Sequence, residues 1–132
     1  MSSTNTYLSN VLSGAVTELR AKSRLRIYQD DPQAWLSDVL GKRWYSKQAE
    51  IVSSFMDSSR TAVKSANGCG KSAVVADLIT WIVATGQPDE TLCIVSAPTL
   101  SQIEKVIFAY LKVNKGLADA NGLPLHGRIT ET

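Results

Sequence analysis

A short run of small residues, Gly68-Cys69-Gly70-Lys71-Ser72, constrains this chain more than any other part of its sequence. It stands between a short apolar stretch, residues 61–64, and a longer stretch of helical periodicity, residues 74–83. Glycines permit a tight turn that brings backbone N–H groups close to an anion, and a helix that begins there directs its free N–H groups to the same anion. The pattern therefore predicts a strand, a phosphate-binding loop and a helix, in that order.

The expected loop comprises residues 65–72. The residues whose backbone would surround the phosphates are Ser65, Ala66, Asn67, Gly68, Cys69 and Gly70. Lys71 is the candidate catalytic residue, because its charge would contact the β- and γ-phosphates, and the Ser72 hydroxyl would ligate Mg²⁺. The usual motif, GxxxxGK[ST], has glycine where this chain has Ser65, so we expect a variant of the loop. The alternative is a glycine-rich structural turn followed by an exposed lysine.

Apolar patterning along the rest of the chain predicts alternating strands and helices. Residues 91–95 form a continuous apolar run, which is typical of a central parallel strand covered on both faces. Helical periodicity returns in residues 103–111, and residues 128–130 are a third candidate strand. We therefore expect an α/β fold of the P-loop NTPase type, an incomplete parallel sheet with flanking helices.

An N-terminal helical extension is expected before this sheet. Apolar pairs recur every four residues between Tyr7 and Leu19, which predicts a helix over residues 5–26 with one apolar face. We accordingly divide the chain into the extension, residues 1–30, and the body of the domain, residues 31–132.

Local capping signals indicate where three helices begin or end. Asp31 is the expected N-cap of a helix that begins at Pro32, since proline at the first helical position loses no hydrogen bond. Gly41 is placed to end that helix in a left-handed conformation. Ser46 is the expected N-cap of the next helix, and Gly86 is expected to stop the helix that follows the loop.

Composition excludes several classes of protein. The 132 residues include 14 Lys and Arg against 12 Asp and Glu, and a net charge of +2 does not by itself argue for nucleic acid or a membrane. No apolar run approaches the roughly 20 residues of a membrane span, and the N-terminus lacks the features of an export signal. The two cysteines and His126 lack the spacing of metal ligands. We expect one soluble intracellular domain.

Five motifs in sequence order resemble the ATPase domain of the large terminase subunit of tailed bacteriophages, the motor that packages DNA into capsids. They are Asp-Pro-x-Ala-Trp from Asp31, Trp-Tyr-Ser-Lys-Gln from Trp44, Ala-Val-Lys-Ser-Ala-Asn-Gly-Cys-Gly-Lys-Ser from Ala62, Val-Ser-Ala-Pro-Thr-x-x-Gln from Val95, and Gly-Arg-Ile-Thr-Glu-Thr from Gly127. The resemblance implies that residues 31–132 are the N-terminal part of a terminase-type ATPase domain, ending before its acidic (Walker B) strand.

The resemblance also implies roles for residues outside the loop. Gln48 matches the glutamine that senses adenine, because its amide can accept a hydrogen bond from adenine N6 and donate one to N7. Trp44 or Tyr45 would either stack on the base or pack beneath the helix. Residues 96–102 would either couple the nucleotide state to DNA or form a plain turn in which Thr99 caps the next helix.

The ligands implied by the resemblance are ATP and Mg²⁺, and the implied activity is ATP hydrolysis that drives DNA translocation in the complete motor. The implied partners are double-stranded DNA, the small terminase subunit, the portal and further copies of the subunit in a pentameric ring, in the cytoplasm of the infected bacterial host.

No strand ending in an acidic residue follows the loop, because Asp89-Glu90 precedes the apolar run and Glu131 has no strand before it. We therefore expect this chain alone to bind ATP without hydrolysing it. Two alternatives stay open, a truncated non-catalytic P-loop binding module and a small P-loop kinase.

Overall fold

The structure is a computed structural model and describes residues 2–64, 70–86, 90–123, 125 and 130. Its regular elements are helices, of which two, labelled η, are π-helical. They are α1 Ser2–Arg26, α2 Pro32–Trp35, η1 Leu36–Leu40, α3 Ser46–Asp57, α4 Lys71–Thr85, α5 Leu100–Gln102, η2 Ile103–Phe108 and α6 Ala109–Ala120.

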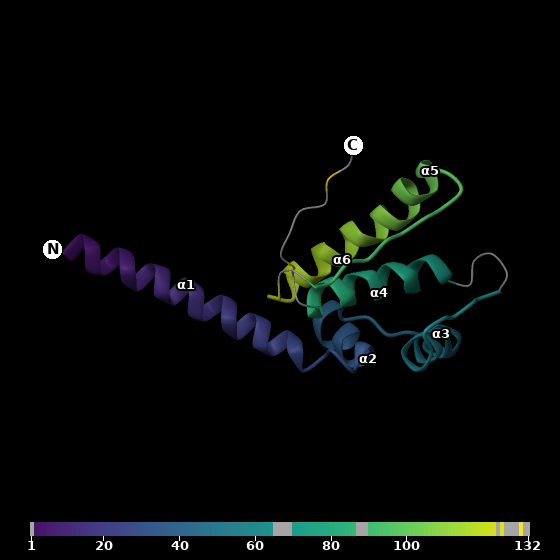
Figure 1. Cartoon of the computed structure of the whole chain (residues 1–132), viewed down its shortest axis with the longest axis horizontal. Coiled ribbons are helices and arrows are strands. Elements are labelled where there is room, and N and C mark those ends of the chain that lie inside the picture. Colours follow the sequence, from purple (N-terminus) through teal and green to yellow (C-terminus); the bar gives the residue numbers. More distant parts are fainter. Residues whose placement is uncertain (1, 65–69, 87–89, 124, 126–129, 131–132) are drawn as a thin grey trace.

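The predicted parallel α/β sheet is wrong for the part of the chain that the structure describes. Residues 61–64 and 91–95, the first two expected strands, lack regular structure there and have no strand partner among the described residues. Figure 1 shows them apart, the first leading away from α3 and the second returning from α4 towards α5. A strand needs the hydrogen bonds of a neighbouring strand, so these segments form no sheet. Of the third expected strand, residues 128 and 129 lie outside the described residues.

The segment that follows α4 alternates in exposure like a strand but is not covered like one. Leu92 and Ile94 are each 81% exposed, whereas Thr91, Cys93 and Val95 are half-buried. In a sheet covered by helices on both faces, all five side chains would be shielded from water. The apolar run therefore does not lie in a buried sheet, because no helices cover both of its faces among the described residues.

The body of the molecule is built around α4. This helix contacts α1, α2, α3, η2 and α6, and Figure 1 shows it between α6 and the pair α2 and α3. Positions three and four residues apart on α4 face the core, as expected for a packed helix. The buried core residues are Trp35, Leu36, Val39, Leu40, Trp44, Val52, Val74, Leu78, Trp81 and Ala118.

The capping predictions are largely confirmed. Asp31 caps α2, because its Oδ1 atom accepts a hydrogen bond at 3.0 Å from the backbone N–H three residues ahead, and Pro32 is the first residue of the helix. Gly41 has φ +65° and follows the last residue of η1. The prediction for α3 is wrong by one residue, since Tyr45 is the N-cap and Ser46 is the first helical residue.

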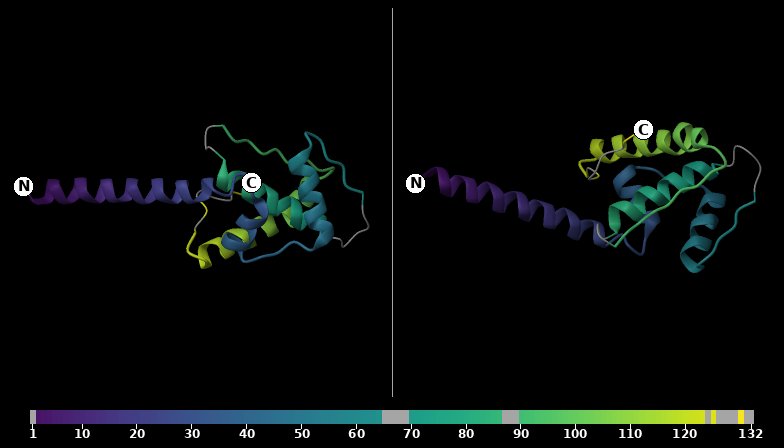
Figure 2. Two further views of the ribbon diagram at one scale, coloured as in Figure 1. Left: turned by 90° about the horizontal axis from the view of Figure 1, so that it is seen from below. Right: turned by 45° about the horizontal axis from the view of Figure 1, so that its top comes forward.

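Helix α1 extends from the body as an arm (Figures 1 and 2), which confirms the predicted N-terminal helix. Its exposed apolar side chains recur on successive turns. They are Tyr7, Leu8, Val11, Leu12 and Val16. Within the described residues, no helix has both the length and the apolar character of a membrane span.

The arm joins the body at the C-terminal end of α4. Trp81 Nε1 donates a hydrogen bond to the carbonyl of Tyr28 at 2.8 Å, and Gln29 Nε2 donates one to the carbonyl of Thr85 at 2.8 Å. Tyr28 Oη donates to Asp38 Oδ2 at 2.9 Å, and this bond raises the pKa of Tyr28 because it stabilises the protonated phenol. The stability that this bond adds is present at neutral pH and is lost only as strongly alkaline solution ionises the phenol.

We predict that Val74→Ala lowers the free energy of unfolding by about 2 kcal/mol, because it removes buried methyl groups and leaves a cavity. Val75→Ala is the matched control on the same helix, since Val75 is 42% exposed and Val74 is fully buried. The control should change the free energy by less than about 0.5 kcal/mol. Denaturant titration followed by circular dichroism measures both values, and equal losses would contradict the orientation of α4.

Candidate nucleotide site

Three residues of the predicted phosphate loop lie within the described part of the chain, at the start of α4. Gly70 precedes the helix, and Lys71 and Ser72 are its first two residues, both half-buried. The first N–H groups of a helix have no partner within it and carry the positive end of its dipole. Helix α4 therefore begins with an anion-attracting end where the sequence predicts phosphates. The loop residues outside the described part are Ser65, Ala66, Asn67, Gly68 and Cys69.

Gln48, the predicted adenine-sensing residue, lies against this end of the loop. It is in the first turn of α3 and is 9% exposed. Its Oε1 atom accepts a hydrogen bond from the N–H of Tyr45 at 3.2 Å, and its Nε2 atom donates one to the carbonyl of Gly70 at 3.4 Å. The fold thus brings together two predicted site residues that are 22 positions apart in the sequence.

Two observations favour glycine at position 70. Its φ of +74° lies in the left-handed region, which side chains with a Cβ atom avoid. A Cβ atom at this position would also stand 2.5 Å from Gln48 Nε2 and 3.6 Å from Tyr45 Oη. A side chain at this position would therefore displace the Gln48 amide from its contact with Gly70.

The two aromatic residues before α3 have different environments. Trp44 is 6% exposed and belongs to the core, so it packs beneath the helix and does not stack on a base. Tyr45 is 49% exposed and lies beside Gly70. Stacking on a base therefore stays a prediction for Tyr45 alone.

A largely buried polar cluster that the sequence motifs do not indicate lies further along α4. We call it the Asp77 cluster, and it comprises Lys42, Trp44, Asp77, Thr80 and Asn114. Trp44 Nε1 donates to Asp77 Oδ2 at 3.0 Å, while Asp77 Oδ1 accepts from Asn114 Nδ2 at 3.0 Å and from Lys42 Nζ at 3.3 Å. Asn114 also donates to Thr80 Oγ1 at 3.1 Å, and Lys42 donates to Asn114 Oδ1. The signal that could have revealed it is an aspartate among the apolar core positions of a helix.

The segment predicted to couple nucleotide and DNA has the features of a plain turn. Thr99 Oγ1 accepts a hydrogen bond from the backbone N–H of Gln102 at 3.4 Å, so it caps α5 as the second alternative expected. Figure 1 shows α5, α3 and the start of α4 at the end of the body away from the arm. Coupling to DNA through residues 96–102 stays a prediction.

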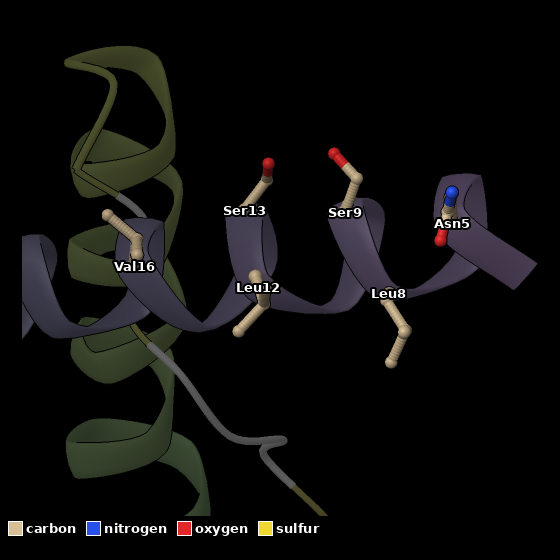
Figure 3. A pocket seen from close by; sticks show the side chains of 6 residues that line it. All are labelled: Asn5, Leu8, Ser9, Leu12, Ser13 and Val16. Carbon is tan, nitrogen blue, oxygen red and sulfur yellow. The ribbon is translucent and has the colours of Figure 1, made fainter.

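Two hollows on the described surface lie away from the candidate site. One runs along α1 and is lined by Leu8, Leu12 and Val16 together with small polar side chains, as Figure 3 shows. Another lies beside α2 near Arg43. Among the described residues, no three His, Cys, Asp or Glu side chains gather where they could hold a metal ion.

A scan against protein-family models, a search of curated proteins and a search of solved structures each found no match to this chain.

We predict that Gly70→Ala lowers the free energy of unfolding by about 1–2 kcal/mol, because the new Cβ atom is strained at positive φ and collides with Gln48. Gly116→Ala is the matched control, since Gly116 lies within α6 and a Cβ atom there would meet nothing within 4 Å. The control should raise the free energy of unfolding by about 0.5–1 kcal/mol. A thermal melt of Gly70→Ala as high as that of the control would contradict the described contact.

Proposed function

We propose that this chain is the N-terminal part of the ATPase domain of a phage large terminase subunit, and that these residues bind ATP. The order of the five sequence motifs supports the family. The observation that carries the proposal is the contact between Gln48 Nε2 and the carbonyl of Gly70 at 3.4 Å. Gln48 is the residue expected to recognise adenine, and Gly70 is at the end of the loop expected to hold the phosphates. The contact between them does not depend on the sheet that the sequence predicted.

The phosphates would be held at the start of α4. The N–H groups there donate to phosphate oxygens, and the helix dipole favours their negative charge. Lys71 adds a full positive charge at the first position of the helix. Mg²⁺ takes oxygen ligands and usually keeps water and phosphate oxygens among them, so the single hydroxyl of Ser72 fits as the contribution of the protein.

The amide of Gln48 is suited to distinguishing adenine from guanine. Its bonds to Tyr45 and Gly70 use one acceptor position of Oε1 and one N–H of Nε2. An amide has two of each, so one acceptor and one donor match adenine N6 and N7. Guanine has an acceptor, O6, in place of the N6 donor. Its O6 would therefore face Gln48 Oε1, which is also an acceptor. Tyr45 is exposed beside this amide and offers a face for the base.

In the complete motor, ATP hydrolysis would drive the translocation of double-stranded DNA. The small terminase subunit, the portal and further copies in a pentameric ring would be the partners, in the cytoplasm of the infected bacterium. No position of this sequence matches the acidic strand that hydrolysis requires, so we propose nucleotide binding as the function of these residues.

A non-catalytic interaction module is the second candidate function. The exposed apolar side chains on successive turns of α1 favour it, because such a stripe is typical of a helix that packs against another surface. Steady hydrolysis of ATP by the 132-residue chain would exclude a purely binding role.

We predict that Lys71→Ala weakens the binding of Mg·ATP by about two orders of magnitude, because charge-assisted hydrogen bonds to phosphate are worth about 3 kcal/mol. Lys47→Ala is the matched control, since the Lys47 side chain is 75% exposed, pairs with Glu50 and precedes Gln48. The control should change the affinity less than about twofold. Isothermal titration calorimetry measures both, and an unchanged affinity in Lys71→Ala would remove the phosphate-binding assignment.

We predict that the wild-type chain binds ATP at least about tenfold more tightly than GTP, because a matched pair of hydrogen bonds to a base gives about 1–3 kcal/mol of discrimination. Gln48→Ala should reduce this ratio towards one, whereas Gln33→Ala, a substitution on α2, should leave it unchanged. Competition binding of the two nucleotides to folded protein measures the ratio. Equal affinity of the wild type for ATP and GTP would contradict the role of Gln48.

A further inference from the structure

The start of α3 is fastened to α4 at two separate points. Gln48, in the first turn of α3, contacts Gly70 at the beginning of α4. Trp44, two residues before α3 begins, donates its indole N–H to Asp77 in the middle of α4. Gly70 and Asp77 are about 10 Å apart along the helix axis, given a rise of about 1.5 Å per residue. Two attachments at this separation fix both the position and the direction of the segment that carries Gln48.

The attachment at Asp77 is specific because the carboxylate is enclosed. Asp77 is 4% exposed, and both of its oxygens are occupied by hydrogen bonds. Lys42 and Asn114 hold Oδ1, which leaves Oδ2 facing the indole of Trp44. A buried carboxylate oxygen without a donor is costly, so the carboxylate holds the Trp44 indole in one orientation.

The direction of Trp44 bears on the amide of Gln48 through the intervening backbone. Tyr45, next to Trp44, donates its N–H to Gln48 Oε1 at 3.2 Å and thereby orients the amide. A shift of Trp44 would move the N–H of Tyr45 with it, and the amide would lose the orientation in which its acceptor and donor match a base. The phosphate end of α4 would be unaffected, because Lys71 and Ser72 belong to α4 itself.

We propose that the hydrogen bond between Trp44 and Asp77 is a positioning element that orients the Gln48 amide and so sets the affinity of the nucleotide site for the adenine base. This inference rests on the proposed function. Neither residue touches the nucleotide, and both act through Tyr45 and Gln48. The affinity for the base therefore depends on this bond, and the affinity for the triphosphate does not.

The test compares two substitutions. Each replaces a buried tryptophan whose indole N–H makes a hydrogen bond that involves a residue of α4. Trp44→Phe removes the bond to Asp77, and Trp81→Phe removes the bond to the carbonyl of Tyr28. The two tryptophans are similarly buried, at 6% and 7% exposed. ATP and inorganic tripolyphosphate, each with Mg²⁺, are the probes, and their affinities for the folded full chain are measured by calorimetry.

We expect Trp44→Phe to lower the ratio of ATP affinity to tripolyphosphate affinity about fivefold, as the loss of one hydrogen bond would, with the tripolyphosphate affinity unchanged. Trp81→Phe should keep both affinities. A wild-type ratio in Trp44→Phe, or an equal fall in Trp81→Phe, would overturn the inference while the nucleotide site stands. A wild-type chain that binds neither probe would defeat the proposed function itself, and the inference with it.

A measurement on the wild type covers the case in which Trp44→Phe does not fold. The indole N–H signals of Trp44 and Trp81 are followed by NMR during titration with each probe. ATP should shift the Trp44 signal and tripolyphosphate should not, whereas the Trp81 signal should stay in place with both. A Trp44 signal that ignores ATP, or that responds equally to tripolyphosphate, would overturn the inference.

Discussion

A carboxylate buried in the central helix organises the body of this protein. Asp77 is 4% exposed in α4 and accepts hydrogen bonds from Lys42, Trp44 and Asn114. A buried carboxylate with a missing partner costs several kcal/mol, so the elements that supply these donors have to meet α4 at this level. The donors come from the segment that leads into α3 and from α6. One side chain thus fixes how both neighbouring elements sit on the central helix.

Helix α4 separates two regions of different character. Its first turn lies beside Gln48 and Gly70, whereas Trp81 and Thr85 near its end hold the junction with the α1 arm. A helix of 15 residues is about 22 Å long, so the candidate site and the base of the arm stand at opposite ends of the body. A partner that packs on the apolar side chains of α1 can therefore bind without covering the candidate site.

The features that could be predicted from sequence are those set by neighbouring residues. The cap of Asp31 and the left-handed Gly41 were found because each acts within one turn of its own helix. The sheet could not be predicted from neighbouring residues, because a strand depends on a partner strand elsewhere in the sequence. The apolar run that includes Leu92 and Ile94 has no such partner strand among the described residues. The apolar neighbours of Asp77 along α4 indicate a buried carboxylate, but its partners are 33 to 37 positions away and no local pattern identifies them.

In the candidate site, too, the local features could be predicted from the sequence and the contacts between distant residues could not. Lys71 and Ser72 were placed at the start of a helix by a local motif, and the structure has them there. The choice between Trp44 and Tyr45 as the exposed aromatic residue depended on tertiary packing, and only the structure decides it. The contact of Gln48 with Gly70 joins two motifs that the sequence could order but could not bring together in space.

In the proposed complex, the base of ATP lies against the first turn of α3 and its phosphates lie at the start of α4. Photolabelling with 8-azido-ATP, followed by protease digestion and mass spectrometry, locates the base. We expect attachment within residues 44–50 that excess ATP prevents and inorganic tripolyphosphate also reduces. Attachment that is confined to α1 or α6, or that ATP fails to prevent, would contradict the proposed complex.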